Sequence, residues 1–236
     1  MTLFLPGTFG ERQVADQWLF KQEGVYIYTS GATYASVFKN ITLKKYWEKI
    51  ETWILANCPP ILDTLNAGAS EQDINNLENV ISLKLPLDFI EFYKIHNGQS
   101  FTHLNLFDGD RLLSVDEIIS EWKLWNEVLP DIDKNCKEMY GEAASSTPDK
   151  GIKPYWWSSS WIPITSNGCG DNYCIDLDPT SDGTCGQIIR MWHDMPNRDL
   201  LATSFKNWID NYVTDLQSGV YTISDDVGWG GIVKKD

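Results

Sequence analysis

The stretch WIPITSNGCGDNYCIDLDP, residues 161–179, decides the fold that the sequence predicts. It has the pattern of two short β-strands joined by a glycine-rich connection. In the second strand the apolar residues Tyr173, Ile175 and Leu177 alternate with Asp176 and Asp178. Successive side chains of a strand point to opposite faces, so the pattern predicts a half-buried strand whose outer face is acidic.

A third strand and a closing helix are predicted after this stretch. The run GQIIRMWHD, residues 186–194, has the apolar centre of a strand. The last helix has the most regular pattern, because its apolar residues recur at steps of three and one, and Gly219 stands where a C-terminal stop belongs. The apolar stripe of this helix consists of Phe205, Trp208, Ile209, Tyr212, Val213 and Leu216.

Three helices are predicted earlier in the chain. Thr42 caps the first, which ends at Pro59–Pro60. Ser70 and Asp73 have the spacing of a capping box for the second. Pro86 suits the first turn of the third, which stops before residues 97–98. The apolar stripe of the first helix consists of Leu43, Tyr46, Trp47, Ile50 and Ile54.

The middle of the chain predicts strands, a turn and one more helix. Residues 101–113 are strand-like, with a turn at residues 108–110. Ser114 and Glu117 form a second capping box, and the helix that they open is expected to close before Pro130. The polar residues 131–154 are interpreted as a helix end followed by a mobile loop.

The N-terminal region predicts a β-hairpin. Residues 25–28 and 33–38 form two aromatic, β-branched runs, with Gly31 in the turn between them. The alternation of Tyr26, Tyr28, Tyr34 and Phe38 predicts that this hairpin docks on the rest of the protein.

Strands and helices grouped without a regular β-α-β alternation indicate an α+β fold with helices packed on one sheet. The runs at residues 161–179, 186–194 and 204–221, together with LPLDFIEFY at residues 85–93 followed by Asn97–Gly98, resemble the signature blocks of the SUKH superfamily. That group contains fungal cell-wall-assembly regulators and bacterial toxin-immunity proteins.

The resemblance implies a single α+β domain with a mixed, mainly antiparallel β-sheet packed by helices. It covers residues 41–223, so residues 1–40 are interpreted as an N-terminal extension with the hairpin, and residues 224–236 as a C-terminal tail. Members of the superfamily act mostly by binding partners, so the resemblance implies a binding protein.

Charge and composition narrow the function classes. The chain has 236 residues and a formal net charge of −14, with the acidic residues densest between residues 101 and 150. Such a field repels nucleic acid and anionic membranes and steers basic partners inward. The chain shows no long apolar segment and no secretion signal, and its five cysteines fit reduced thiols, so a cytoplasmic location is expected.

No metal site, cofactor or catalytic set is predicted. Cys169, Cys174, Cys185 and His193 lack the close Cys-x₂-Cys pair of structural zinc sites, and small residues in a strand–turn–strand region explain them better. Residues 108–110 do not follow a calcium-loop pattern. No nucleophile elbow or phosphate loop accompanies the three histidines, so the protein is expected not to be an enzyme.

The sequence therefore predicts an acidic protein-binding domain. On the resemblance, the leading hypothesis is an immunity protein that neutralises a basic, nuclease-type toxin domain, without nucleic acid or membrane as partner; the alternative is a regulatory or scaffold protein of the cell-wall-assembly-regulator type. An acidic face with an aromatic anchor suits the first. The predicted partner-binding residues are Asp171, Asp176, Asp178, Asp108, Asp110, Trp156 and Trp157.

Overall fold

The centre of the fold is a five-stranded sheet that is buried on both faces. A computed structural model describes residues 10–14, 17–22, 25–29, 31–225 and 230–235, with side chains from residue 43 onward. The strand order is β5-β10-β9-β8-β6, and every pair is antiparallel except β5 with β10. The strands are β5 (Thr147–Pro148), β6 (Trp161–Pro163), β8 (Asn172–Asp176), β9 (Gln187–Met191) and β10 (Asn197–Ala202).

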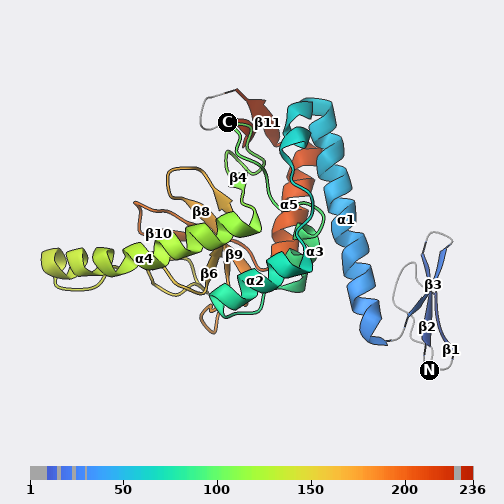
Figure 1. The fold of residues 1–236 in the computed structure, drawn as a ribbon, viewed down its shortest axis with the longest axis horizontal. Helices are drawn as coiled ribbons and strands as arrows, with labels where there is room; N and C mark the ends of the chain where they lie inside the picture. The colour runs from blue at the N-terminus through green and yellow to red at the C-terminus, as the bar shows by residue number, and fades with distance from the viewer. Residues whose placement is uncertain (1–9, 15–16, 23–24, 30, 226–229, 236) are drawn as a thin grey trace.

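One face of the sheet packs on helices from both ends of the chain. Ile162, Ile175 and Ile188 point into the larger core, which α1 (Gly31–Asn57), α2 (Glu71–Ile81), α3 (Leu87–Tyr93) and α5 (Phe205–Ser218) complete. The short 3-10 helix η1 (Pro59–Thr64) follows α1. Figure 1 shows α1 and α5 side by side at one end of the sheet.

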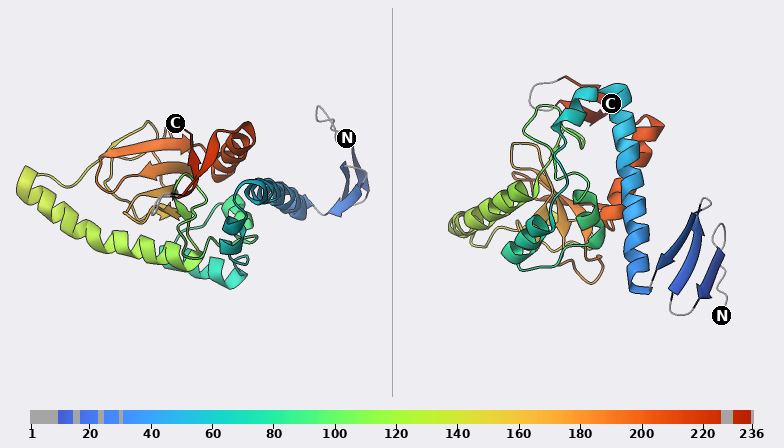
Figure 2. Two further views of the ribbon diagram at one scale, coloured as in Figure 1. Left: turned by 90° about the horizontal axis from the view of Figure 1, so that it is seen from above. Right: turned by 45° about the vertical axis from the view of Figure 1, so that its right-hand side comes forward.

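The other face packs on α4 (Val115–Tyr140). Trp161, Cys174 and Ile189 point into this smaller core, together with Trp125 of α4 and Trp157. Figure 2 shows α4 running beneath the strands, with its C-terminal part projecting beyond the sheet. The alternation that the sequence predicted is thus present, but both of its sides are buried.

Three smaller sheets complete the fold. They pair β1 (Gly10–Val14), β2 (Gln17–Gln22) and β3 (Val25–Thr29); β4 (Arg111–Leu112) and β7 (Thr165–Ser166); and β11 (Tyr221–Ser224) and β12 (Gly231–Lys234). The predicted α+β fold with a mixed, mainly antiparallel sheet and helices packed on it is confirmed. No helix in the described part of the chain is both long and apolar enough to span a bilayer.

Several element predictions are confirmed at the level of single caps. Ser70 accepts from the backbone N–H of Asp73, and Ser114 accepts from that of Glu117, so both capping boxes are formed. Gly219 ends α5 with φ 77°. The five predicted core residues of α1 are all buried.

Other element predictions are wrong. The predicted strand at residues 33–38 lies inside α1, although β3 agrees with the first arm of the predicted hairpin. α4 does not close before Pro130 but continues to Tyr140. Proline removes one hydrogen bond from the helix ladder, and the turns beyond it still form. Strand β10 was not predicted, and β12 occupies part of the predicted tail.

The side chains of the N-terminal extension lie outside the described residues, so its docking stays a prediction. The division of the chain at residues 40 and 223 also stays a prediction.

The Ser114 cap provides a test of the fold of α4. Ser114→Ala removes the acceptor for an N-terminal backbone N–H and should lower the free energy of unfolding by about 1 kcal/mol. Urea unfolding measures this value. Ser120→Ala is the matched control on the same helix, because the Ser120 hydroxyl only donates to the carbonyl of Asp116, four residues earlier. Equal stability of the Ser114→Ala variant and the native chain would contradict the role of the cap.

Candidate functional site

The predicted turn at residues 108–110 is formed, and its two aspartates lie in different environments. Asp108 and Gly109 both have positive φ, 49° and 81°, and Phe107 and Asp110 exchange backbone hydrogen bonds of 2.9 and 2.8 Å. Asp108 lies at the surface, where its carboxylate accepts from the backbone N–H of Lys234 at 2.9 Å. Asp110 points into the protein instead.

Asp110 forms a buried ion pair with Arg190 of β9. Its carboxylate accepts from Nη1 and Nη2 of Arg190 and, at 2.8 Å, from the hydroxyl of Thr165. Asp110 is 1% exposed and Arg190 7% exposed. Burial alone would lower the pKa of Arg190, but the neighbouring charges, Asp110 above all, raise it above its ordinary value. The guanidinium therefore stays charged inside the protein.

Asp171 is held on the other side of Arg190 by a polar loop. Its Oδ1 accepts from the backbone N–H and Nδ1 of His193, at 2.9 and 2.8 Å, and its Oδ2 accepts from Asn167 at 2.7 Å. Gly170 permits this arrangement, because a Cβ at that position would lie 3.0 Å from the His193 side chain. Burial alone would raise the pKa of Asp171, but these hydrogen bonds lower it below its ordinary value.

The expectation that Asp176 points outward is wrong. Asp176 is fully buried and accepts from Gln187 Nε2 at 2.8 Å and from the backbone N–H of Asp178 at 3.0 Å. The strand alternation does place it opposite Ile175, but α4 and the segment before β6 cover that face as well. Asp178 lies beyond the end of β8 and is exposed, paired with Lys153 at 2.6 Å.

The expectation of an exposed Trp157 anchor is also wrong. Trp157 is 2% exposed and stacks on Trp125, with ring centroids 5.3 Å apart. Trp156 is half-buried, and the guanidinium of Arg198 lies 5.1 Å from the centre of its ring. The indole of Trp156 thus contacts a residue of the same chain.

The predicted site residues therefore do not form one acidic face. Asp110 and Asp171 flank Arg190 inside the protein, whereas Asp176 supports the turn after β8. Asp108 and Asp178 remain at the surface, and their role in partner binding stays a prediction.

The cysteines at positions 169, 174 and 185 differ in their exposure. Cys169 and Cys185 are exposed, and Cys174 is buried, which raises the pKa of its thiol well above the ordinary value. Among the described residues, the one group of three potential metal ligands within 4.8 Å of one another is Asp171, His193 and Asp194. Asp171 in this group already accepts three hydrogen bonds from protein donors.

A small aromatic pocket is connected to the Asp110–Arg190 pair through Tyr173, which lines the pocket and whose ring centre lies 4.4 Å from the Arg190 guanidinium. Its volume is about 170 Å³, and it is bounded by the turn at residues 107–110, β8, β10, α5, β11 and β12. The rings in its wall belong to Phe107, Tyr173, Trp208, Tyr212 and Tyr221, and the charged residues are Asp108, Asp215 and Lys234. We call this set the aromatic pocket.

Helical spacing explains the α5 side of the aromatic pocket. Trp208, Tyr212 and Asp215 stand at positions i, i+4 and i+7, so they share one face of the helix. Trp208 meets Tyr173 edge to face at 5.7 Å, and Tyr212 meets Tyr221 in the same way at 5.2 Å. The Tyr212 hydroxyl donates to the carbonyl of Leu106, which fixes the floor of the pocket.

The sequence indicated only part of this pocket. Trp208 and Tyr212 were predicted as core residues, which they are, but they also line the pocket. Tyr221 and Lys234 come from a hairpin that was not predicted. The β-branched residues of Tyr221–Ser224 and Gly231–Lys234 were the available signal for it.

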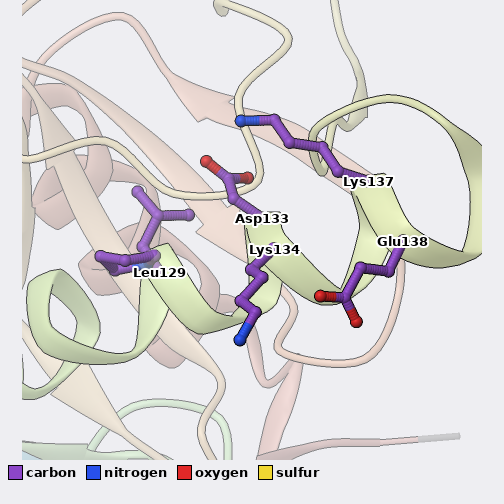
Figure 3. Close-up of a pocket in the computed structure, with 6 residues that line it drawn as sticks. Leu129, Asp133, Lys134, Lys137 and Glu138 are labelled. Atoms are coloured by element: carbon purple, nitrogen blue, oxygen red, sulfur yellow. The ribbon is translucent and has the colours of Figure 1, made fainter.

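A larger and more open cavity of about 620 Å³ lies on the projecting part of α4. Figure 3 shows Asp133 and Lys137 on one side of the helix and Lys134 and Glu138 on the other. Each pair has the i,i+4 spacing of ordinary surface charges. Because its walls come from a single helix and its charges balance, this cavity is a weaker candidate than the aromatic pocket.

Comparison with known proteins finds similarity to the members of one protein family. A sequence model of the SMI1 / KNR4 family (SUKH-1) matches residues 68–211. The chain is 27% identical to KNR4/SMI1 homolog 2 of Debaryomyces hansenii, over 81% of this chain and 38% of that protein. It is 26% identical to the glucan synthesis regulatory protein of Neurospora crassa, over 76% of this chain and 39% of that protein.

A third relative is the cell wall assembly regulator SMI1 of Saccharomyces cerevisiae, which is 22% identical over 76% of this chain and 41% of its own length. The chain thus spans about two fifths of the length of these curated relatives.

The buried ion pair provides the first test of the site. Asp110→Asn leaves the guanidinium of Arg190 buried without its countercharge and should lower the free energy of unfolding by about 3–5 kcal/mol. Asp178→Asn is the matched control, because this exposed carboxylate should change stability by less than about 0.5 kcal/mol. Urea unfolding compares the two variants. Similar small losses in both would show that Asp110 is not a structural partner of Arg190.

Asp171 provides a test by pH. Because its pKa is lowered in the folded protein, the unfolded chain takes up the proton more readily, and stability is lost as pH falls through the folded-state pKa. The free energy of unfolding of the native chain should therefore fall more steeply below about pH 4 than that of Asp171→Asn. Parallel curves from urea unfolding at pH 5, 4 and 3 would contradict this assignment.

Proposed function

The chain belongs to the SMI1/KNR4 family (SUKH-1), and on this premise we propose that it is a non-catalytic, protein-binding regulator of cell wall assembly that acts in the cytoplasm. The observation that carries the proposal is the family match together with the names of three relatives. These are a glucan synthesis regulatory protein, a cell wall assembly regulator and a cell wall biosynthesis/cell cycle regulator. They favour the regulatory alternative over toxin immunity.

The hydrogen bonds of the histidines support binding over catalysis. His96 bonds to the carbonyl of Asn66 and to Glu51, and His193 bonds to Asp171. Within the described part of the chain, neither histidine bonds to a serine, threonine or cysteine side chain. A serine, threonine or cysteine nucleophile that is activated by a histidine needs such a pair within hydrogen-bond reach.

The charge of the chain supports a protein partner with a basic surface. A net charge of −14 speaks against nucleic acid and anionic lipid as partners. It favours fast, salt-dependent association with basic proteins.

Replacement of the matching region in a relative tests the proposed function. In Saccharomyces cerevisiae, the region of the cell wall assembly regulator SMI1 that matches this chain is replaced by the chain, and growth is measured on a dye that stresses the wall. The chimera should restore growth that is lost when the regulator is deleted. Ile209→Asp in the same chimera is the control without a folded domain, because Ile209 is fully buried.

A chimera that accumulates to the level of the native regulator, yet leaves the cells as sensitive as the deletion strain, would contradict the proposed function.

A further inference from the structure

The size of the aromatic pocket limits what it can hold. Its volume of about 170 Å³ is below the roughly 300–1,000 Å³ of typical small-molecule and cofactor sites. A pocket of this size suits one side chain of a partner. Its walls are already formed by packed rings, so binding does not require the pocket to be built first.

The carboxylates of the pocket are available to a ligand. Within the described residues, no side-chain or backbone donor bonds to the carboxylate of Asp215. Among the donors of the described residues, Asp108 accepts one hydrogen bond, through Oδ1, from the backbone of Lys234. Two acidic residues thus line a half-enclosed space, and their carboxylates have free acceptor positions.

The position of Asp215 favours a cation nearby. It lies in the last turn of α5, where the unpaired carbonyls give the helix end a partial negative charge. The negative end of the helix repels a carboxylate at this position. A bound cation would be attracted both by the helix end and by the carboxylate.

The guanidinium of Arg190 does not neutralise the carboxylates of the pocket. Arg190 lies 4.4 Å from the centre of the Tyr173 ring, but it is paired with Asp110, and Asp171 stands 3.9 Å from its Nη2. Burial raises the pKa values of Tyr173, Tyr212 and Tyr221, and the negative charge of Asp108 raises all three further. The charged residues that line the pocket, Asp108 and Asp215 against Lys234, therefore leave a net charge of −1.

The rings themselves favour a positive charge. Aromatic faces attract an ammonium or guanidinium group within about 6 Å of the ring centre. The exposed Lys234 shows this contact at the rim, with its Nζ 5.9 Å from the centre of the Tyr221 ring.

We propose that the aromatic pocket binds one basic side chain, lysine or arginine, presented by a protein partner, with the rings of Tyr173, Trp208 and Tyr221 around its stem and head and Asp108 and Asp215 as its countercharges. This inference rests on the proposed function in one respect, namely that the partner is a protein.

Titration of the full chain with short peptides tests the inference. The probes are the capped tripeptides Gly-Arg-Gly and Gly-Lys-Gly, with norleucine and glutamate in the central position as controls of matched size and opposite charge. The readout is the NMR signal of the Trp208 indole N–H, assigned through Trp208→Phe. A basic peptide should shift this signal with a dissociation constant of about 1 mM and bind about fivefold more tightly than the norleucine peptide.

Variants locate the site. Asp108→Asn tolerates the positive φ and keeps an oxygen acceptor for the Lys234 backbone, so it removes the charge alone. Asp108→Asn and Asp215→Asn should each weaken the basic peptides about 2- to 5-fold. Asp131→Asn, an exposed site on α4, is the control with the same change in net charge. Lys234→Gln removes the competing cation and should tighten binding.

Equal binding of the norleucine and arginine peptides would overturn the inference, as would weaker binding in Lys234→Gln. The two proposals also fail separately. If the chimera restores growth but no basic peptide shifts the Trp208 signal, the pocket inference is wrong and the proposed function stands. If the peptides bind but the chimera does not restore growth, the pocket inference stands without its regulatory role.

Discussion

The buried ion pair between Asp110 and Arg190 joins parts of the chain that are 80 residues apart. Asp110 comes from a tight turn, and Arg190 from the centre of the sheet, where it also stacks on Tyr173 and approaches Asp171. Removing two charges from water costs several kcal/mol each, and this cost is offset by their mutual attraction, by the hydrogen bond from Thr165 to Asp110 and by the carboxylate of Asp171 beside Arg190. The turn is therefore held in one place, and with it Asp108 and the front of the aromatic pocket.

The same sheet explains why acidic residues that the sequence placed outside lie inside. An antiparallel sheet that faces water on one side alternates apolar and polar residues, and residues 173–178 follow this pattern. Here α4 covers the second face, and Asp176 is accommodated by Gln187 and by a backbone N–H. Single-strand alternation cannot distinguish a solvated carboxylate from one whose partner lies elsewhere in the chain.

Local signals predicted part of what local interactions determine, although Thr42, which was predicted to cap the first helix, lies inside α1. The caps at Ser70 and Ser114 and the stop at Gly219 depend on residues within one helical turn, and all three were predicted correctly. The passage of α4 through Pro130 was not, because tertiary contacts of Trp125 and of the returning loop, whose Ala144 N–H donates to Asp133, stabilise the helix on both sides of the proline. The aromatic pocket is lined by residues of six separate segments, so no single segment predicts it.

The composition of the pocket follows from how the fold is assembled. Asp108, Tyr173 and Trp208 lie within the region that the family model matches, whereas Asp215, Tyr221 and Lys234 follow it. The first group is fixed by the ion pair and by the core of the sheet, so substitutions there affect folding as well as binding. The second group lies on the last turn of α5 and on the two-stranded sheet of β11 and β12, where Tyr221 belongs to the main core but Asp215 and Lys234 are not buried. Changes at Asp215 and Lys234 can therefore alter which side chain the pocket accepts while the buried framework stays intact.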